Sequence, residues 1–144
     1  MATVQDVMVR DVVTIDSSAT LLEAAKLMRD ANVGMLPVVE IGVVRGIVTD
    51  RDLVIRAMTR DIRPSEVPVN ECLSEPPQCA QPDWSLDEAM DEMARQQVGR
   101  LPVVDGAGRA IGVVTLSSLA LRSRKQQETL ETAQEVARRS ERVA

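Results

Sequence analysis

The sequence of 144 residues contains no histidine, tyrosine or phenylalanine, and Trp84 is its only aromatic residue. Without an imidazole, the Ser-His-Asp relay, ordinary histidine acid–base catalysis and most zinc and copper sites are excluded. The lack of aromatic side chains argues against nucleic-acid modules that bind by base stacking. The core must therefore be filled by Val, Leu, Ile, Ala and Met.

Cysteine, long apolar runs and positive charge are also scarce. Cys72 and Cys79 have no partner residues at the spacing of metal ligands, so we interpret them as reduced thiols. No stretch approaches the roughly 18 apolar residues of a membrane span, and the first residues lack the apolar centre of a signal peptide. With 17 basic and 22 acidic residues, the net charge of -5 opposes general attraction to nucleic acids or anionic membranes. We expect a cytoplasmic protein.

The chain repeats itself after 65 positions. The shift places residues of the first copy on identical residues of the second: Leu21, Glu23, Ala24, Met28, Val33, Gly34, Leu36, Pro37, Val38 and Val39 lie over Leu86, Glu88, Ala89, Met93, Val98, Gly99, Leu101, Pro102, Val103 and Val104. After one extra residue in a turn, the match resumes with Gly46, Val48, Thr49 and Leu53 over Gly112, Val114, Thr115 and Leu119. This pattern indicates a duplicated structural unit.

Each copy predicts the same order of elements. Thr20 with Glu23, and Ser85 with Glu88, have the spacing of capping boxes that begin helices. Apolar residues at helical spacing follow, and two Val-rich runs joined by a glycine-containing turn predict two strands. A second helix starts at Thr49 in the first copy, and a short extended piece precedes each first helix. The unit is therefore β-α-β-β-α, which places the chain in the α/β class.

A unit of about 60 residues is marginally stable alone, so we expect the two copies to pack together about a pseudo-twofold axis. We predict a first repeat over residues 1–63, a second over residues 64–122 and a helical tail over residues 123–144. The tail carries a thin apolar stripe, which we expect to pack on another subunit or partner; a frayed tail is the alternative. The stripe comprises Leu130, Ala133, Val136 and Ala137, and the basic residues expected to stay in water are Arg122, Arg124, Lys125, Arg138, Arg139 and Arg142.

The run from Gly46 to Asp52 reads as a buried strand that opens directly into a helix. Free amides at a helix N-terminus attract phosphate, Arg51 can add charge-assisted hydrogen bonds, and the Asp52 carboxylate can accept both hydroxyls of a ribose. This chemistry suits a nucleotide. Thr49 and Asp52 also have the spacing of a capping box with Asp in place of Glu, which would only begin the helix. The residues alone leave both interpretations open.

The duplicated unit resembles the CBS domain family. The resemblance rests on the L-x-E-A, V-G-x-L-P-V-V and G-I-V-T-x-R-D motifs, and it covers residues 1 to about 122 as a tandem pair called a Bateman module. It implies a non-catalytic sensor that binds AMP, ATP or S-adenosylmethionine in clefts between the repeats. It implies no metal, no catalytic residue and no obligatory cofactor.

Carried onto this chain, the resemblance implies that residues of both repeats form the first cleft: Ile47, Thr49, Arg51, Asp52, Cys79, Ala80, Arg100, Leu101 and Pro102. Asp52 would hold the ribose, Thr49 and Arg100 the phosphate, and the apolar residues the adenine. The second cleft would comprise Thr14, Ile15, Met35, Leu36, Pro37, Thr115 and Ser118. Ser118 stands where the pattern has Asp, and Met35 stands where the other copy has Arg100. We therefore predict that the second cleft binds weakly or stays empty.

The sequence thus predicts a cytoplasmic signal-transduction module that binds an adenosine nucleotide and regulates a partner protein in trans. The resemblance also implies a homodimer made by the second helices of the repeats, with an apolar face of Leu53, Ile55, Ala57, Leu116, Leu119 and Ala120. The alternative is a ligand-free dimeric interaction or stress-response scaffold that uses the same fold and the helical tail. No nucleophile–base pair, metal cluster or phosphate loop supports an enzyme.

Overall fold

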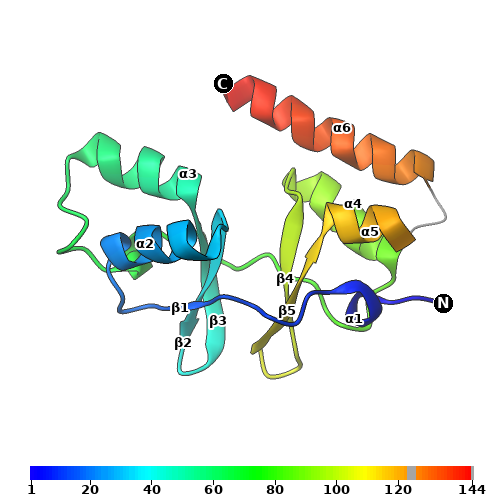
Figure 1. Ribbon diagram of the computed structural model, residues 1–144, viewed down its shortest axis with the longest axis horizontal. Coiled ribbons are helices and arrows are strands. Elements are labelled where there is room, and N and C mark those ends of the chain that lie inside the picture. Colours follow the sequence, from blue (N-terminus) through cyan, green and yellow to red (C-terminus); the bar gives the residue numbers. More distant parts are fainter. Residues whose placement is uncertain (123–125, 144) are drawn as a thin grey trace. The chain divides into compact units, whose positions relative to one another are not determined.

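A computed structural model describes residues 1–122 and 126–143 of the chain, and side chains over residues 1–122 and 130–141 (Figure 1). The chain is a mixed α/β protein that divides into two compact units. The repeat-one unit comprises Val13–Gln78 with Ala107–Ala110, and the repeat-two unit comprises Met1–Val12, Cys79–Gly106 and Ile111–Ala144. The units follow proximity in space whereas the predicted boundaries follow the sequence repeat, so those boundaries and the pseudo-twofold packing stay predictions.

The repeat-one unit has a three-stranded sheet in the order β1-β2-β3, with β1 parallel and β3 antiparallel to β2. Its elements are β1 (Ile15–Asp16), α2 (Leu21–Ala31), β2 (Met35–Glu40), β3 (Val43–Thr49), α3 (Asp50–Asp52), a π-helical turn (Leu53–Ala57) and two 3-10 turns (Met58–Arg60 and Val69–Glu71). The predicted capping box of α2 is confirmed, because Thr20 Oγ1 accepts from Glu23 N–H (3.1 Å) and Glu23 Oε2 accepts from Thr20 N–H (3.0 Å).

The repeat-two unit repeats this plan with a two-stranded sheet. Its elements are α1 (Val4–Val7), α4 (Leu86–Gln96), β4 (Arg100–Val104), β5 (Ala110–Thr115), α5 (Leu116–Arg122) and α6 (Gln126–Val143). The Ser85 side chain caps α4 by accepting from Glu88 N–H (3.1 Å). In both units, buried Leu, Val, Ala and Met side chains of helix and sheet form the core, as the composition predicts.

Each unit also contains a leading arm from the opposite copy. The arm over residues 3–9 pairs with β5, because Val9 and Val113 exchange two backbone hydrogen bonds of 2.8 and 2.9 Å. The arm over residues 69–78 pairs with β3, because Ser74 and Ile47 exchange two backbone hydrogen bonds of 2.8 and 3.2 Å. Ser74 lies 65 positions after Val9, so the two arms are equivalent in the repeat. Each unit therefore joins the body of one repeat to the arm that precedes the other.

Two glycines make room for the arms. A Cβ on Gly46 would lie 2.8 Å from the Ser74 carbonyl oxygen, and a Cβ on Gly112 would lie 2.9 Å from the Val9 carbonyl oxygen. Real Cβ atoms do not come this close to backbone oxygens. The space beside the arm therefore requires glycine at this position of each copy.

The tail prediction is partly wrong. Helix α6 contacts α4 and α5 of its own unit (Figure 1). Leu130 of the predicted stripe is 52% exposed, whereas Thr132 is buried. Arg139, expected in water, is half-buried against α4. Arg124 and Lys125 lie outside the described residues, as does the side chain of Arg142.

The predicted dimer face is also partly wrong. Ala57 and Leu119 are buried, each in the hydrophobic core of its own unit. On the helical segment after α3, Ile55 of the predicted face is exposed, and so are the neighbouring Val54 and Met58. In the described part of the chain, no helix combines the length and the apolar character needed to cross a membrane.

Candidate functional site

Thr49 and Asp52 lie where β3 turns into the helical segment that begins with α3. Thr49 is in extended conformation (φ -116°, ψ 163°), and its Oγ1 accepts from the Asp52 N–H (3.1 Å). Asp52 Oδ2 accepts in return from the Thr49 N–H (2.9 Å). Thr49 and Asp52 therefore form a capping box, as their spacing predicts.

The Asp52 carboxylate has a second neighbour, Arg56. Its Nε lies 3.6 Å from Asp52 Oδ1, and the Asp52 side chain is only 14% exposed. Arg56 Nη1 also donates to the Leu73 carbonyl (3.1 Å), which ties the helix to the arm along β3. Sequence reasoning missed Arg56, although its spacing of four residues from Asp52 is the spacing of a helical ion pair.

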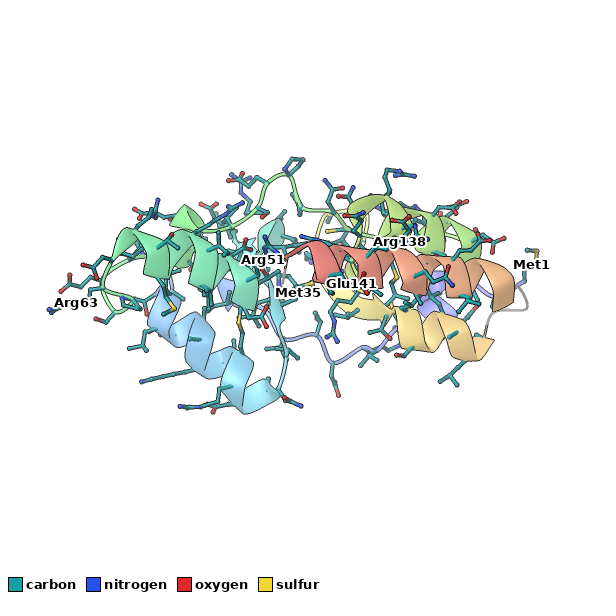
Figure 2. All side chains as sticks on the ribbon, turned by 90° about the horizontal axis from the view of Figure 1, so that it is seen from above. Met1, Met35, Arg51, Arg63, Arg138 and Glu141 are labelled. Atoms are coloured by element: carbon teal, nitrogen blue, oxygen red, sulfur yellow. The ribbon has the colours of Figure 1, made fainter. Side chains whose placement is uncertain are left out.

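The other predicted residues of the repeat-one unit gather at the same end of its sheet. Met35 of β2 is opposite Thr49 of β3 in the register, and both Met35 and Arg51 are at this end of the unit in Figure 2. Arg51 is exposed, and its N–H donates to Asp50 Oδ1 (2.8 Å). Ile47 is half-buried, and Leu36 and Pro37 are buried in β2.

The remaining two residues assigned to the repeat-one unit lie at the start of β1 and directly before it. Ile15 is buried opposite Val38 of β2, and Thr14 precedes it half-buried. The repeat-one unit therefore holds one half of each predicted cleft.

Thr115 and Ser118 form the corresponding turn in the repeat-two unit. Thr115 Oγ1 accepts from the Ser118 N–H (3.1 Å), and Ser118 Oγ accepts from the Thr115 N–H (3.2 Å). The geometry of the cap is thus kept, but a neutral hydroxyl replaces the carboxylate of the first copy. This turn has no charge to offer a ligand.

Arg100 lies beside this turn at the start of β4. Its side chain is exposed, and the preceding Gly99 carbonyl accepts from the N–H of Leu116, the first residue of α5 (2.8 Å). Leu101 and Pro102 follow as buried residues of β4. Arg100 is therefore the one cation among the predicted residues of the repeat-two unit.

Cys79 and Ala80 form a short extended piece against β4. Ala80 is buried, and its N–H donates to the Pro102 carbonyl (2.8 Å). Burial raises the pKa of the Cys79 thiol to about 11, so the thiol is neutral at ordinary pH. Within the part of the chain that the structure describes, no three Cys, Asp or Glu side chains converge to hold a metal ion.

Several known proteins are similar to this chain. The CBS domain-containing protein YhcV of Bacillus subtilis is 41% identical over 121 residues, which cover 84% of this chain and 85% of the relative. A conserved CBS domain protein from Thermoplasma acidophilum superposes with a TM-score of 0.78 at 25% identity, over 92% of this chain and 76% of that one. The CBS domain pair of protein MJ0100 was solved with 5′-methylthioadenosine and S-adenosyl-L-methionine. It gives a TM-score of 0.73 at 25% identity, and the match covers 84% of this chain and 94% of that one.

The family model of the CBS domain matches the chain twice, over residues 4–59 and 69–124. The two matches start 65 positions apart, as the internal repeat does, and each includes a leading arm. Because they span more than half of the chain and the fold agrees with solved CBS pairs, the protein belongs to the CBS domain family and carries two CBS domains in tandem.

Proposed function

We propose that this protein is a non-catalytic regulatory module that binds an adenosine-containing nucleotide of the AMP, ADP or ATP class. CBS pairs are a regulatory type of domain, and the proposal adds the ligand and its contacts. The observation that carries it is the Asp52 carboxylate, held beside Thr49 at the start of a helical segment with 14% of its side chain exposed. A fixed, partly desolvated carboxylate is suited to accept the two hydroxyls of a ribose.

The cap leaves Asp52 able to bind a diol. An ionised carboxylate has about four acceptor positions, and the cap occupies one of them on Oδ2. Oδ1 faces Arg56 Nε at 3.6 Å, which is longer than a hydrogen bond, so its lone pairs are available to hydroxyl donors. Ligand binding at Oδ1 therefore does not require the helix cap to break.

The other contacts come from residues of both repeats. Thr49 and Arg100 would bind the phosphate, Arg51 would add a further cation, and the apolar residues would surround the adenine: Ile47, Cys79, Ala80, Leu101 and Pro102. The complex of protein MJ0100 with two adenosine compounds supports this class of ligand, S-adenosylmethionine included. Binding favours one arrangement of the repeats, and the population shift reaches a partner protein or a second copy.

The half-sites with Thr115 and Ser118 would bind the same ligand less tightly. Loss of a charge-assisted hydrogen bond costs about 1.5 to 3 kcal/mol, which is roughly one to two decades of affinity. Met35, in the position that corresponds to Arg100, adds no positive charge for the phosphate. We therefore propose one tight site per chain.

Calorimetric titration of the full chain with AMP, ATP and S-adenosylmethionine tests the proposal. We expect one tight site, and we expect Asp52→Asn to weaken it about 10- to 100-fold because the amide keeps the shape but not the charge. Ser118→Ala is the matched control in the other repeat and should leave the tight site unchanged. Undiminished binding by Asp52→Asn, or two equally tight sites, would contradict the proposal.

A ligand-free dimeric scaffold is the second candidate, and the exposed Val54, Ile55 and Met58 favour it. Neighbouring apolar side chains of this size in water are typical of an interaction surface. A nucleotide at one hundred times its dissociation constant stabilises a protein by about 2.7 kcal/mol, which a thermal-shift assay detects. No shift with any of the three ligands, together with a dimer mass in light scattering, would favour the scaffold.

A further inference from the structure

Helix α6 binds the C-terminal end of α4 through polar contacts. Arg139 Nη1 donates to the carbonyl oxygens of Gln97 (2.9 Å) and Gln96 (3.3 Å). Gln97 Nε2 donates in turn to Glu135 Oε2 (3.3 Å), one helical turn before Arg139. The last carbonyls of a helix lack partners within the helix and carry its partial negative charge. A cation from α6 therefore completes the end of α4.

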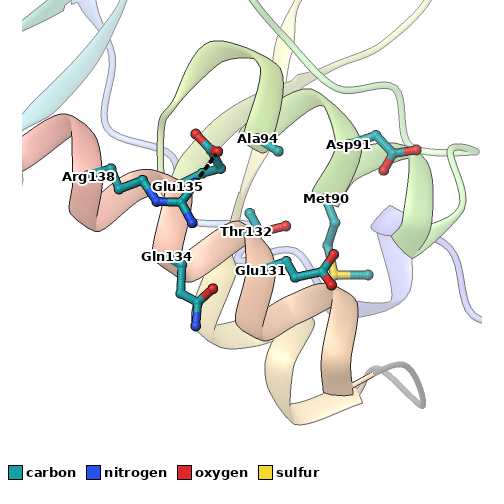
Figure 3. A pocket seen from close by; sticks show the side chains of 8 residues that line it. All are labelled: Met90, Asp91, Ala94, Glu131, Thr132, Gln134, Glu135 and Arg138. Carbon is teal, nitrogen blue, oxygen red and sulfur yellow. Dashed lines mark hydrogen bonds and ion pairs between the residues drawn. The ribbon is translucent and has the colours of Figure 1, made fainter.

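The rest of the contact between α6 and α4 includes an open pocket. Among the α6 side chains over residues 130–141, Thr132 is the buried one, and Leu130 stays half-exposed. A cavity of about 360 Å³ lies between the two helices, and Met90 and Ala94 of α4 line it together with Thr132 (Figure 3). A helix with few buried apolar contacts opens locally at low cost in free energy. The bonds of Arg139 to the α4 carbonyls are therefore among the contacts that hold α6 in place.

The corresponding surface of α2 in the first repeat is exposed to solvent. Ala25 and Arg29 of α2 stand 65 positions before Met90 and Ala94, and both are exposed. The two helices are otherwise alike, since each ends at a residue in the left-handed conformation, with φ 54° at Asn32 and 56° at Gln97. The surface that α6 covers therefore differs from its counterpart on α2 by a larger apolar residue, Met90 for Ala25, and by the loss of a charge, Ala94 for Arg29.

The residues bound by α6 lead directly into the proposed phosphate site. Gln97 is the C-cap of α4, and Arg100 follows three residues later at the start of β4. Between them, the Gly99 carbonyl accepts from Leu116 N–H at the start of α5 (2.8 Å). When Arg139 fixes the Gln96 and Gln97 carbonyls, it restricts the turn that leads to Arg100.

We propose that α6 is a reversibly docked helix, and that its docking on Gln96 and Gln97 and the binding of a nucleotide at Arg100 stabilise one another. This coupling rests on the proposed function and adds its regulation. Docking restricts the turn before the ligand arrives, so the ligand loses less entropy on binding. By linkage, nucleotide must strengthen the docking of α6 by the factor by which docking strengthens nucleotide binding. A partner that takes up α6 would then lower the affinity for nucleotide.

Hydrogen exchange of the full chain, measured by mass spectrometry, tests the docking. Without ligand, Arg139→Ala should speed exchange of the amides over residues 130–141 about tenfold, because the bonds to two carbonyls are lost. Arg138→Ala is the matched control: it removes the same charge from the adjacent position, where the side chain pairs with Glu135 of its own helix (2.8 Å), and exchange should change less than twofold. Arg139→Lys should restore part of the protection. Equal effects of Arg139→Ala and Arg138→Ala would overturn the docking role.

AMP added to the same proteins tests the coupling. In the wild type, saturating AMP should slow exchange of α6 by about fivefold, and Arg139→Ala should weaken AMP binding in calorimetry by a similar factor. Arg138→Ala should bind AMP like the wild type. AMP binding with unchanged exchange of α6 would overturn the coupling and leave the proposed function intact. Absence of binding of AMP, ATP and S-adenosylmethionine by the wild type in calorimetry would overturn the proposed function, and the coupling with it.

Discussion

The two repeats begin their second helix with equivalent caps. The cap of the first repeat carries a negative charge, and the cap of the second repeat is neutral. Thr49 with Asp52 and Thr115 with Ser118 make equivalent reciprocal bonds between side chain and backbone. Ser118 thus preserves the start of the helix, and what the second copy has lost is an anionic acceptor. The comparison shows that the cap itself does not require a carboxylate at this position, and the proposed ligand contact is the demand that would.

The helical faces of the two repeats differ as well. Helix α4 carries Met90 and Ala94 under α6, whereas α2 presents Ala25 and Arg29 to solvent. Among the differences between the two copies are therefore one at the proposed ligand contact and one on the helix surface. Substitutions that exchange features between the copies can test each difference.

The largest expected effect concerns what the copies share, namely the glycines beneath the leading arms. Gly46→Ala and Gly112→Ala should each destabilise the protein by about 1 to 3 kcal/mol, since the new Cβ overlaps a backbone carbonyl that cannot rotate away. Urea unfolding monitored by circular dichroism measures the loss. Gly99→Ala is the control, because no atom lies within 4 Å of its new Cβ, and it should be neutral or slightly stabilising. Similar stability of all three variants would contradict the arm contacts.

An intermediate effect is expected when the missing charge is restored to the second copy. Ser118→Asp should keep the cap and strengthen the weaker site about tenfold, because a carboxylate again accepts hydroxyl donors. Calorimetric titration with AMP would then show a second measurable site, still weaker than the first because Met35 supplies no cation. An unchanged isotherm in a folded variant would mean that the charge at this position does not decide ligand binding.

The smallest effect concerns the Cys79 thiol, which burial keeps neutral. Its pKa in the folded protein is about 11, against an ordinary value of 9.0. Between these values the unfolded chain releases the proton and the folded chain keeps it, so stability falls as pH rises from 9 to 11. Below pH 9 both states are protonated and this slope disappears. Urea midpoints over this range should fall less steeply for Cys79→Ala than for the wild type; parallel slopes would contradict the assignment.

Local pattern predicted much of the fold. The repeat, the order of helices and strands, and the capping of α2 all follow from residues close together in sequence, such as Thr20 and Glu23. The pairing of Thr49 with Asp52 was also readable from spacing alone. Such features are predictable because propensity, apolar periodicity and capping act within a few residues.

Long-range placement was not predictable in the same way. Periodicity indicated that α6 has an apolar stripe. Where α6 contacts its own unit, however, Thr132 is buried and Leu130 of the stripe stays exposed. Arg139 was expected in water because nothing near it in sequence reveals the α4 carbonyls that it binds. Ala57 was assigned to an intermolecular face because composition does not say which side of a helix meets its own sheet.

Because each leading arm pairs with the body of the other repeat, cleavage of the chain between the repeats would affect both units. Cleavage near residue 64 would separate each body from the arm that pairs with it, since Ser74 closes β3 and Val9 closes β5. Each fragment would then expose the backbone donors and acceptors of a strand edge, which is a template for pairing with other chains. We therefore expect each fragment to fold poorly alone, and the two fragments to recover the fold when they are mixed and complement each other.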